Sequence, residues 1–219
     1  FAFSNSQIKS IKLPQSIIEL KDKCFNYIPN LTLFSISPKN KFYSFFDDKF
    51  IIKKINQSDN NYGEIVFARK DIKEAIIPSF IKRISKFAFH NCGEIMKVEF
   101  LFNSELKYID EYAFDLTSIT EITIPSSLKI IGKFAFSNCN KLKKVNFMDN
   151  SELELIDENA FYGSPIESIL IPSKVNRIEK EAFHYCCQLQ LIEFENNSML
   201  KTISFYSFSS ALIEYILIP

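Results

Sequence analysis

Apolar residues recur along this chain with a period far longer than one helical turn or the alternation of a strand. The landmark is the dipeptide Ala-Phe, and from Phe89 to Phe208 the repeat phenylalanines follow at steps of 25, 22, 25, 22 and 25 residues. A second landmark keeps the double step of 47 residues, at Ile77-Pro78, Ile124-Pro125 and Ile171-Pro172. The chain is therefore predicted to consist of alternating 22- and 25-residue units.

One unit near the N-terminal end is longer than the others. Leu13-Pro14 precedes Ile77-Pro78 by 64 residues, 17 more than the double step. Counting 25 residues on from Phe25 reaches Phe50, and counting 22 residues back from Phe89 reaches Phe67. The extra segment is 51–66, whose apolar ends surround a polar centre containing Asn, Asp and Gly. That pattern predicts a β-hairpin that protrudes from one coil. With this unit included, the chain contains nine units.

The short alternating runs within each unit predict strands rather than helices. In Val145-Asn146-Phe147 the apolar residues alternate with period two, and no unit carries an uninterrupted helical stripe. A unit of this size cannot bury its apolar side chains alone, so neighbouring units must stack on one another. We predict a mainly β solenoid of about nine coils, which spans residues 1–219 as a single domain and is a fragment of a longer protein.

Composition removes several classes of function. Lys and Arg number 26 and Asp and Glu number 26, so the formal net charge is zero and no nucleic acid partner is expected. The four glycines do not form the glycine-rich loops that bind dinucleotides or triphosphates. No apolar run approaches the length that crosses a bilayer. We expect no cofactor and no direct insertion of this segment into a membrane.

Three of the five cysteines, Cys92, Cys139 and Cys186, are spaced by 47 residues and so occupy the same position in alternate coils. Two coils separate them by roughly 10 Å, which is too far for a disulfide or a shared metal ion. They are predicted to be free, buried thiols, whereas Cys187 is on the other side of the chain. We expect no metal site.

The two histidines, His90 and His184, each follow a repeat phenylalanine and lie four coils apart. They cannot share a metal or a substrate, and nothing indicates the third group that a nucleophilic Cys186 beside His184 would need. The paired carboxylates Asp47 and Asp48 fit a turn better than acid–base chemistry. No catalytic residue is predicted, and the protein is not expected to be an enzyme.

The side chains that point outward from the strands, at the same position of successive coils, form the candidate binding surface. Toward the C-terminal end these positions become apolar around one carboxylate. They predict a partner-binding patch of Leu170, Leu191, Glu193, Tyr215 and Leu217. The alternative is that further coils or a capping segment cover these side chains.

In the middle of the same face the outward positions are charged. Glu74, Lys97, Glu121 and Lys144 alternate in sign on neighbouring strands, which predicts a ladder of ion pairs across the sheet. Exposed pairs of this kind contribute little to stability. The ladder is therefore expected to serve solubility.

The repeat follows the pattern I-P-x-x-L/V-x-x-I-x-x-x-A-F-x-x-C-x-x-L-x-x-I/V-x-F. It is seen from Ile124 to Phe147, with Ala135-Phe136 and Cys139 in the middle. This pattern resembles the BspA-like class of leucine-rich repeats and covers essentially the whole chain. The resemblance implies a right-handed solenoid found in surface proteins of certain bacteria and parasitic protozoa, where it serves adhesion and protein binding.

Two functions remain open at this point. The first is a non-catalytic protein-recognition or adhesion module, a cell-surface or secreted antigen that binds host or extracellular-matrix proteins through the exposed strand face. The second is an intracellular, cytoplasmic scaffold or regulatory protein. Sequons for glycosylation at Asn30, Asn56 and Asn196 give weak support to the secretory route.

Overall fold

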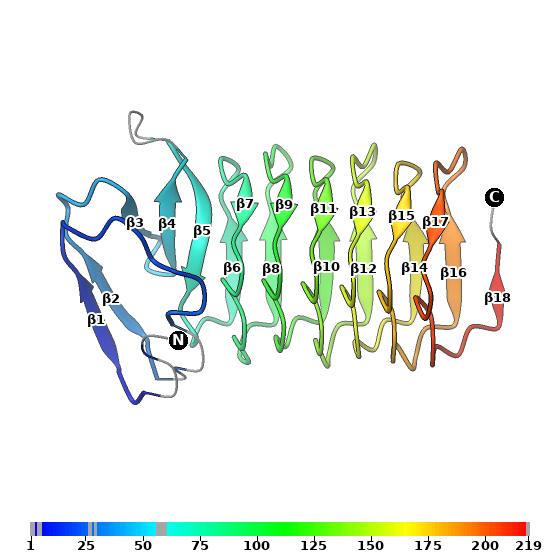
Figure 1. The fold of residues 1–219 in the computed structure, drawn as a ribbon, viewed down its shortest axis with the longest axis horizontal. Helices are drawn as coiled ribbons and strands as arrows, with labels where there is room; N and C mark the ends of the chain where they lie inside the picture. The colour runs from blue at the N-terminus through cyan, green and yellow to red at the C-terminus, as the bar shows by residue number, and fades with distance from the viewer. Residues whose placement is uncertain (1–2, 4–5, 26–27, 29, 56–60, 218–219) are drawn as a thin grey trace.

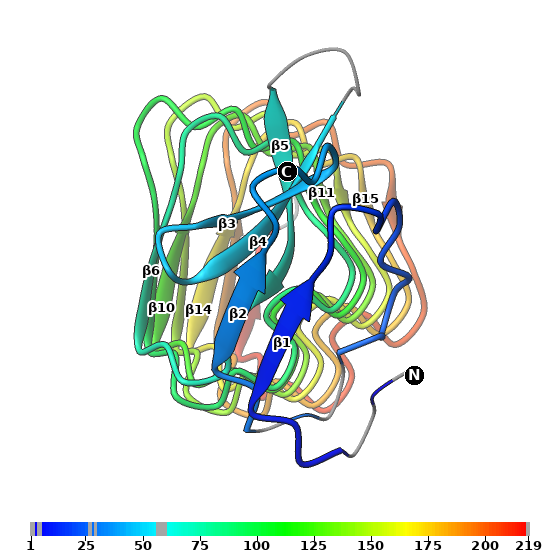
Figure 2. The same ribbon diagram turned by 90° about the vertical axis from the view of Figure 1, so that its left-hand side faces the viewer.

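The computed structural model describes residues 1–219 except 1–2, 4–5, 26–27, 29, 56–60 and 218–219. Within these residues the chain forms 18 strands and no helix. The coils are stacked side by side in a row that runs from the N-terminal to the C-terminal end (Figure 1). Seen along the row, one coil lies behind another around a shared interior (Figure 2). The predicted mainly β solenoid is confirmed.

One strand of each coil in the main stack belongs to a parallel sheet whose side chains alternate between the interior and solvent. Its strand order is β18-β16-β14-β12-β10-β8-β6. Ile122 and Ile124 are buried, whereas Glu121 and Thr123 are exposed, as expected for a half-buried strand. The strands are β6 (Glu74–Ile77), β8 (Lys97–Phe100), β10 (Glu121–Ile124), β12 (Lys144–Phe147), β14 (Ser168–Ile171), β16 (Leu191–Phe194) and β18 (Tyr215–Ile216).

A second, nine-stranded sheet closes the other side of each coil. Its regular strands contain two residues each, and the second residue is an isoleucine that is buried in every coil but the last. These strands are β7 (Arg83–Ile84), β9 (Tyr108–Ile109), β11 (Ile130–Ile131), β13 (Leu155–Ile156), β15 (Arg177–Ile178) and β17 (Thr202–Ile203). The sheet ends in three longer antiparallel strands, β3 (Tyr43–Phe46), β4 (Phe50–Lys54) and β5 (Tyr62–Ala68).

The inserted hairpin consists of β4 and β5 and separates two hydrophobic cores. Phe50 and Ile52 belong to the larger core of the main stack, while Ile51 between them belongs to a smaller core at the N-terminal end. On β5, Ile65 belongs to the larger core and Phe67 to the smaller one. Both faces of the hairpin are buried, so successive residues are apolar. The sequence predicts a hairpin that protrudes from one coil, and the structure instead places its strands inside the stack.

The first two coils form a separate part of the strand face. β1 (Ser10–Leu13) and β2 (Leu33–Ile36) pair in a two-stranded parallel sheet of their own. They lie beyond the hairpin and are tilted against the strands of the main stack (Figure 1). Leu13 at the end of β1 is part of the smaller core. The outward face is therefore divided at the hairpin and is not continuous over nine coils.

A column of stacked phenylalanine rings runs through the larger core. Neighbouring ring centroids lie 4.7 to 5.4 Å apart, and the planes are within 21° of parallel. The members are Phe89, Phe114, Phe136, Phe161, Phe183 and Phe208. The N–H of Phe114 donates to the carbonyl of Ala135 at 2.8 Å, and the N–H of Phe136 donates to that of Ala160 at 2.7 Å. Ring contact and a backbone hydrogen bond thus join successive coils at the same residue.

At its N-terminal end the column continues to Phe50 and not to Phe67. The Phe50 and Phe89 centroids lie 5.7 Å apart, with the planes inclined by 60°. Phe67 packs in the smaller core, with its ring centroid 5.2 Å from that of Phe25. Counting from the two sides predicts both Phe50 and Phe67 for this place, and the structure fills it with Phe50, because β4 brings that ring against Phe89.

Each regular coil turns through two residues with left-handed backbone, two positions before and two positions after the repeat phenylalanine. Around Phe136 these are Phe134 and Asn138, with φ of 54° and 52°. Among the described glycines, Gly163 alone has a left-handed φ. Most of these positions therefore carry side chains that disfavour the left-handed region. The hydrogen bonds and ring contacts between coils must offset that cost.

Replacing Phe136 by alanine should destabilise the fold by about 3 to 5 kcal/mol, because it removes a fully buried ring from the middle of the column. The matched control is Phe102→Ala. Phe102 is 94% exposed, so its loss should change stability by less than about 0.5 kcal/mol. Urea unfolding followed by circular dichroism measures both variants. Equal unfolding midpoints would contradict the central role of the ring column.

Candidate functional site

The structure places the predicted patch at the C-terminal end of the seven-stranded sheet. Leu170 on β14 is in register with Glu193 on β16, and Leu191 on β16 is in register with Tyr215 on β18. Leu217 directly follows β18. Leu170 is 47% exposed, Tyr215 and Leu217 are each 62% exposed, and Leu191 is half-buried. The register predicted from the repeat is confirmed, whereas partner binding by this patch stays a prediction.

A shallow depression lies on the same face, over β12, β14 and β16. Leu170 and Glu193 line it together with Asn146 and Glu195. The Oε2 atom of Glu195 accepts a hydrogen bond from the N–H of Ser173 at 2.8 Å, which fixes that carboxylate. An apolar side chain flanked by two carboxylates suits a partner side chain with an aliphatic stem and a positive charge.

The inward side of the last coil is uncovered within the described residues. Ile203 and Ile216 are 38% and 37% exposed, whereas the equivalent Ile178 and Ile192 of the preceding coil are fully buried. Tyr215 lies on the same strand as Ile216. Its exposed side chain can therefore contact either a partner protein or a further coil stacked on this end. Leu170 lies two strands further in, on a strand with neighbours on both sides.

Exposed apolar residues also lie outside the predicted patch, and Phe102 and Ile76 are two examples. Phe102 follows β8 and is almost wholly exposed. The equivalent residues 47 and 94 positions later are the polar Asp149 and Asn196. An apolar residue at a position that is polar in other coils is the sequence signal that could have identified Phe102 as exposed. Ile76, outward on β6, is 50% exposed at the opposite end of the sheet. Its exposure shows that apolar outward positions are not confined to the C-terminal coils.

The predicted ladder of ion pairs across the strand face is replaced by a pair within one strand. Glu74 and Glu121 are both in register with Lys97, as the repeat predicts. The ammonium of Lys97 nevertheless contacts Glu99 on its own strand at 2.5 Å. The hydrogen bond to Glu99 raises the pKa of Lys97, and the charges of Glu74 and Glu121 act in the same direction. Lys97 therefore stays positively charged between three carboxylates.

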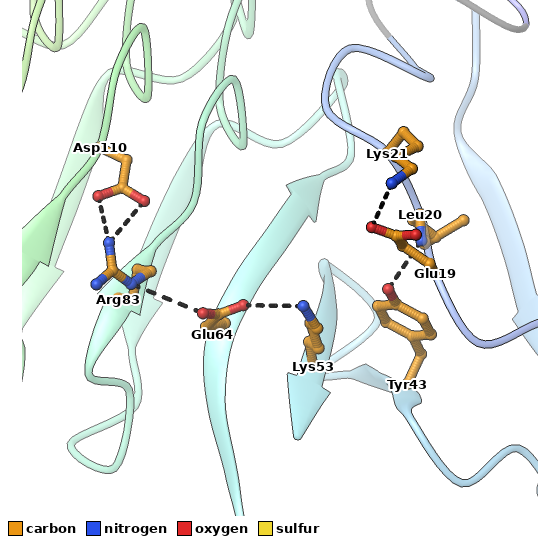
Figure 3. Close-up of polar contacts among 8 residues, drawn as sticks. All are labelled: Glu19, Leu20, Lys21, Tyr43, Lys53, Glu64, Arg83 and Asp110. Carbon is orange, nitrogen blue, oxygen red and sulfur yellow. Dashed lines mark hydrogen bonds and ion pairs between the residues drawn. The ribbon is translucent and has the colours of Figure 1, made fainter. Parts of the chain in front are cut away.

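Ion pairs between neighbouring coils occur mainly along the second sheet, with Lys143 and Glu167 forming one beside the starts of β12 and β14. A chain of such contacts joins the hairpin to the first regular coils (Figure 3). Glu64 on β5 lies 3.8 Å from Lys53 on β4 and 3.7 Å from Arg83 on β7, and Arg83 contacts Asp110 at 2.6 Å. The Arg83 guanidinium also lies over the ring of Tyr108, 4.2 Å from its centroid. These contacts fix the hairpin against the stack.

The five cysteines are free, and three are buried at equivalent positions while one is exposed, as predicted: Cys92, Cys139 and Cys186 are buried and Cys187 is exposed. The Sγ of Cys139 donates to the carbonyl oxygen of Phe114, and that of Cys186 donates to the carbonyl oxygen of Phe161, each at 3.2 Å. Burial raises the pKa of both thiols to about 12. Both are protonated at neutral pH and are not activated nucleophiles.

The two histidines lie in different surroundings. His90 is buried with its Nδ1 atom 3.1 Å from Oδ2 of Asp115, while Nδ1 of His184 lies 3.0 Å from the carbonyl oxygen of Ser209. In the described part of the chain no three His, Cys, Asp or Glu side chains are grouped so that they could hold a metal ion. The described residues also contain no helix that is long and apolar enough to cross a membrane.

Two of the three glycosylation sequons fall within the described residues. Asn30 is exposed and its Nδ2 donates to Oε1 of Gln7 at 2.8 Å. Asn196 is exposed in the turn after β16. Asn56 lies outside the described residues. Glycosylation at these positions stays a prediction.

Thiol labelling of the native protein should reach Cys187 first and leave Cys139 and Cys186 unmodified until the protein unfolds. The reason is exposure for Cys187, and burial with a raised pKa for the other two. Labelling with a maleimide at pH 7.5, followed by peptide mass spectrometry, measures the order. Equal labelling rates for all cysteines would show that the core is open.

The same thiols make stability depend on alkaline pH. Their folded pKa of about 12 exceeds the ordinary value of 9.0, so the stability they contribute is present below about pH 9 and is lost as pH rises toward 12. The variant carrying Cys139→Ala and Cys186→Ala should therefore lose less stability than the wild type between these limits. An identical loss in both proteins would assign the alkaline unfolding to other groups.

Comparisons with known proteins agree with this geometry. The family described as BspA type leucine rich repeat region, with six copies, matches residues 1–70, 60–186 and 107–219. A search of curated proteins finds no match. Among solved structures, a leucine-rich repeat protein from Eubacterium ventriosum aligns over 97% of this chain and 61% of its own, with a TM-score of 0.75 and 19% identity.

Two further solved structures share the fold. The pneumococcal vaccine antigen PcpA aligns over 71% of this chain and 39% of its own, with a TM-score of 0.60 and 28% identity. A leucine rich cell surface protein from Faecalibacterium prausnitzii aligns over 92% of this chain and 53% of its own, with a TM-score of 0.60 and 19% identity. The chain thus spans less than two thirds of each of these proteins. The family match extends over the whole sequence, and the chain belongs to the BspA-type leucine-rich repeat family.

Proposed function

We propose that this chain is a non-catalytic module that recognises other proteins through the outward face of its seven-stranded sheet. The observation that carries the proposal is the exposed pair Leu170 and Glu193, which lie in register on β14 and β16 and line one depression. Membership of a leucine-rich repeat family supports protein recognition in general. The fold by itself names no ligand, so the partner is inferred from the chemistry of this face.

The chemistry of the face favours a partner segment that contains apolar side chains together with Lys or Arg. Leu170, Leu191 and Tyr215 offer apolar contact, and interfaces obtain most of their binding energy from a few such anchors. Glu193 and Glu195 place carboxylates beside Leu170, where a basic group can form charge-assisted hydrogen bonds. The sheet holds these groups at fixed spacing, so little ordering is needed when a partner binds.

The surroundings of the reactive side chains support a non-catalytic role. The thiols of Cys139 and Cys186 donate to backbone carbonyls inside the core, and their raised pKa keeps them protonated. His90 and Asp115 contact each other in the interior, where both side chains are almost wholly buried. These side chains form contacts between neighbouring coils. None of them lies in the depression around Leu170.

A finer part of the proposal concerns the biological setting. We propose that the chain acts as an adhesin at the cell surface or after secretion and binds host or extracellular-matrix proteins. The likeness to the pneumococcal antigen PcpA supports this setting. The exposed sequons at Asn30 and Asn196 are compatible with the secretory route. A cytoplasmic scaffold is the alternative outcome.

Changing Leu170 and Tyr215 to lysine should weaken binding to a partner at least tenfold, because charge replaces two apolar anchors. Biolayer interferometry of the purified chain against a panel of extracellular-matrix proteins measures the affinities. The control is Ile76→Lys, an equally exposed outward residue at the other end of the same sheet, which should change the affinity less than twofold. Loss of binding with the control alone would place the site elsewhere. Absence of micromolar binding to every panel member would overturn the adhesin proposal.

Antibodies against the purified chain should label intact cells as strongly as permeabilised cells, because the proposed setting places the outward face outside the membrane. The measurement is flow cytometry of both preparations, with an antibody to a cytosolic protein as the control for intactness. Labelling that appears only after permeabilisation would support the scaffold and reject surface display. Removal of N-linked glycans with a shift in apparent mass would independently support the secretory route.

A further inference from the structure

A lysine lies in the interior of the stack, directly beside a cysteine of the next coil. Lys70 is buried, with 7% of the residue exposed, and Cys92 is fully buried. Nζ of Lys70 donates to the carbonyl oxygen of His90 at 2.6 Å and lies 3.7 Å from Sγ of Cys92. The same nitrogen lies over the ring of Phe67, 4.7 Å from its centroid. The contacts that the structure gives this amine are thus a carbonyl, an aromatic face and a thiol.

The repeat shows what normally occupies this position. The residues three positions after Phe67 and after each repeat phenylalanine from Phe89 to Phe183 are all buried: Lys70, Cys92, Thr117, Cys139, Ser164 and Cys186. Thr117 and Cys139 occupy the positions equivalent to Lys70 and Cys92, 47 residues later. Oγ1 of Thr117 lies 3.2 Å from Sγ of Cys139. A short hydroxyl side chain therefore suffices elsewhere. Lys70 places an amine where the other coils have a hydroxyl group.

The regular contacts between neighbouring coils change between the coil that contains Lys70 and the coil that contains Cys92. The rings of Phe50 and Phe89 are inclined by 60° here, whereas all later ring pairs of the column are close to parallel. The seven-stranded sheet ends at β6 of the same coil, because β2 does not continue it. The backbone contact is shifted by one residue, with the N–H of Ala68 donating to the carbonyl of Ala88 at 2.8 Å. The strands on either side of this boundary still pair, β5 with β7 and β6 with β8, so it differs from the others in its ring contact and its backbone register.

We propose that Lys70 and Cys92 form an oxidative cross-link in which a single oxygen atom joins Nζ to Sγ. The amine and the thiol already lie within contact distance on neighbouring coils, and the burial of both excludes the competing reactions of exposed groups. The bond ties the hairpin coil covalently to the next coil. The site is independent of the binding face on β14 and β16.

The reaction balances with dioxygen as the oxidant. The S–H bond of Cys92 and one N–H bond of Lys70 break, one S–O and one O–N bond form, and the second oxygen atom leaves as water with the two hydrogens. Sulfur and nitrogen each lose two electrons, and dioxygen accepts four. Two molecules of hydrogen peroxide supply the same oxidising equivalents and leave three water molecules. Both oxidants are small and uncharged, and local opening of the stack admits them.

The protonation states support this chemistry. Desolvation lowers the pKa of Lys70, which favours the neutral amine with its free lone pair. Burial raises the pKa of Cys92, so the sulfur is held as a thiol. Both shifts favour the uncharged forms, and oxidation of the uncharged pair buries no new charge.

The test is peptide mapping of the purified 219-residue chain after exposure to air or dilute hydrogen peroxide. The expected product joins the peptide of Lys70 to that of Cys92 and is heavier than their sum by one oxygen less two hydrogens. Trypsin should fail to cleave after Lys70, and dithiothreitol should restore the separate peptides. The cross-linked protein should unfold at a temperature on the order of 5 °C above that of the reduced protein.

Variants distinguish the cross-link from ordinary cysteine oxidation. Lys70→Met keeps an unbranched apolar side chain in the core and should abolish the linked peptide, as should Cys92→Ser. Cys139→Ser is the matched control, because the neighbour of Cys139 is Thr117 and no amine is present; this variant should still form the link. Because the wild-type peptide map alone decides the question, a variant that fails to fold leaves the test intact.

Two results would overturn the proposal. One is a wild-type protein in which oxidised Cys92 carries whole oxygen atoms and Lys70 remains cleavable by trypsin. The other is a linked product of the same mass in Lys70→Met, which would assign the bridge to another amine.

Discussion

The stacking of each repeat phenylalanine on the next is the contact on which the rest of this structure depends. A single coil of 22 or 25 residues has no second layer to cover its apolar face. The ring column supplies that cover, with centroids 4.7 to 5.4 Å apart, while the N–H of each column residue from Phe89 to Phe183 donates to a carbonyl of the next coil. The two sheets follow from this contact, because once the rings are in register the strands on either side meet their neighbours in register. The left-handed turns around Phe136 are tolerated for the same reason.

The column of residues three positions after the phenylalanine completes the joint between coils. The backbone of the tight turn presents carbonyl groups toward the interior, and buried carbonyls need donors. Cys139 and Cys186 supply thiol donors to Phe114 and Phe161, and the hydroxyl of Ser164 donates to Phe136 at 2.7 Å. This explains why small side chains with a donor recur there with a period of 47 residues. It also explains why the thiols of Cys139 and Cys186 are not activated nucleophiles at neutral pH, since each is a buried structural donor with a raised pKa.

Residue counting predicts the register of the regular coils correctly but fails at the hairpin. The period places Leu170 beside Glu193 and Leu191 beside Tyr215 because identical units stack identically. The hairpin has no counterpart in other coils, so its length alone suggests a projection. The decisive signal is the apolar run Phe50-Ile51-Ile52, which needs cover on both faces. The repeat also does not predict which carboxylate pairs with Lys97. The side chain of Lys97 is flexible and can reach Glu74, Glu99 or Glu121, so local geometry and not strand register determines its partner.

Inward and outward side chains have different roles, and this difference bears directly on function. Inward side chains such as Phe136 are fixed by neighbours on two coils, so their chemistry cannot change without cost to the fold. Outward side chains such as Leu170 and Ile76 are about half exposed, and their replacement is expected to cost less stability than that of a core ring. A solenoid can therefore acquire a binding surface without altering its core. It also follows that loss of binding after an outward substitution reports on recognition rather than on folding, which is the condition that makes the surface of β14 and β16 open to experiment.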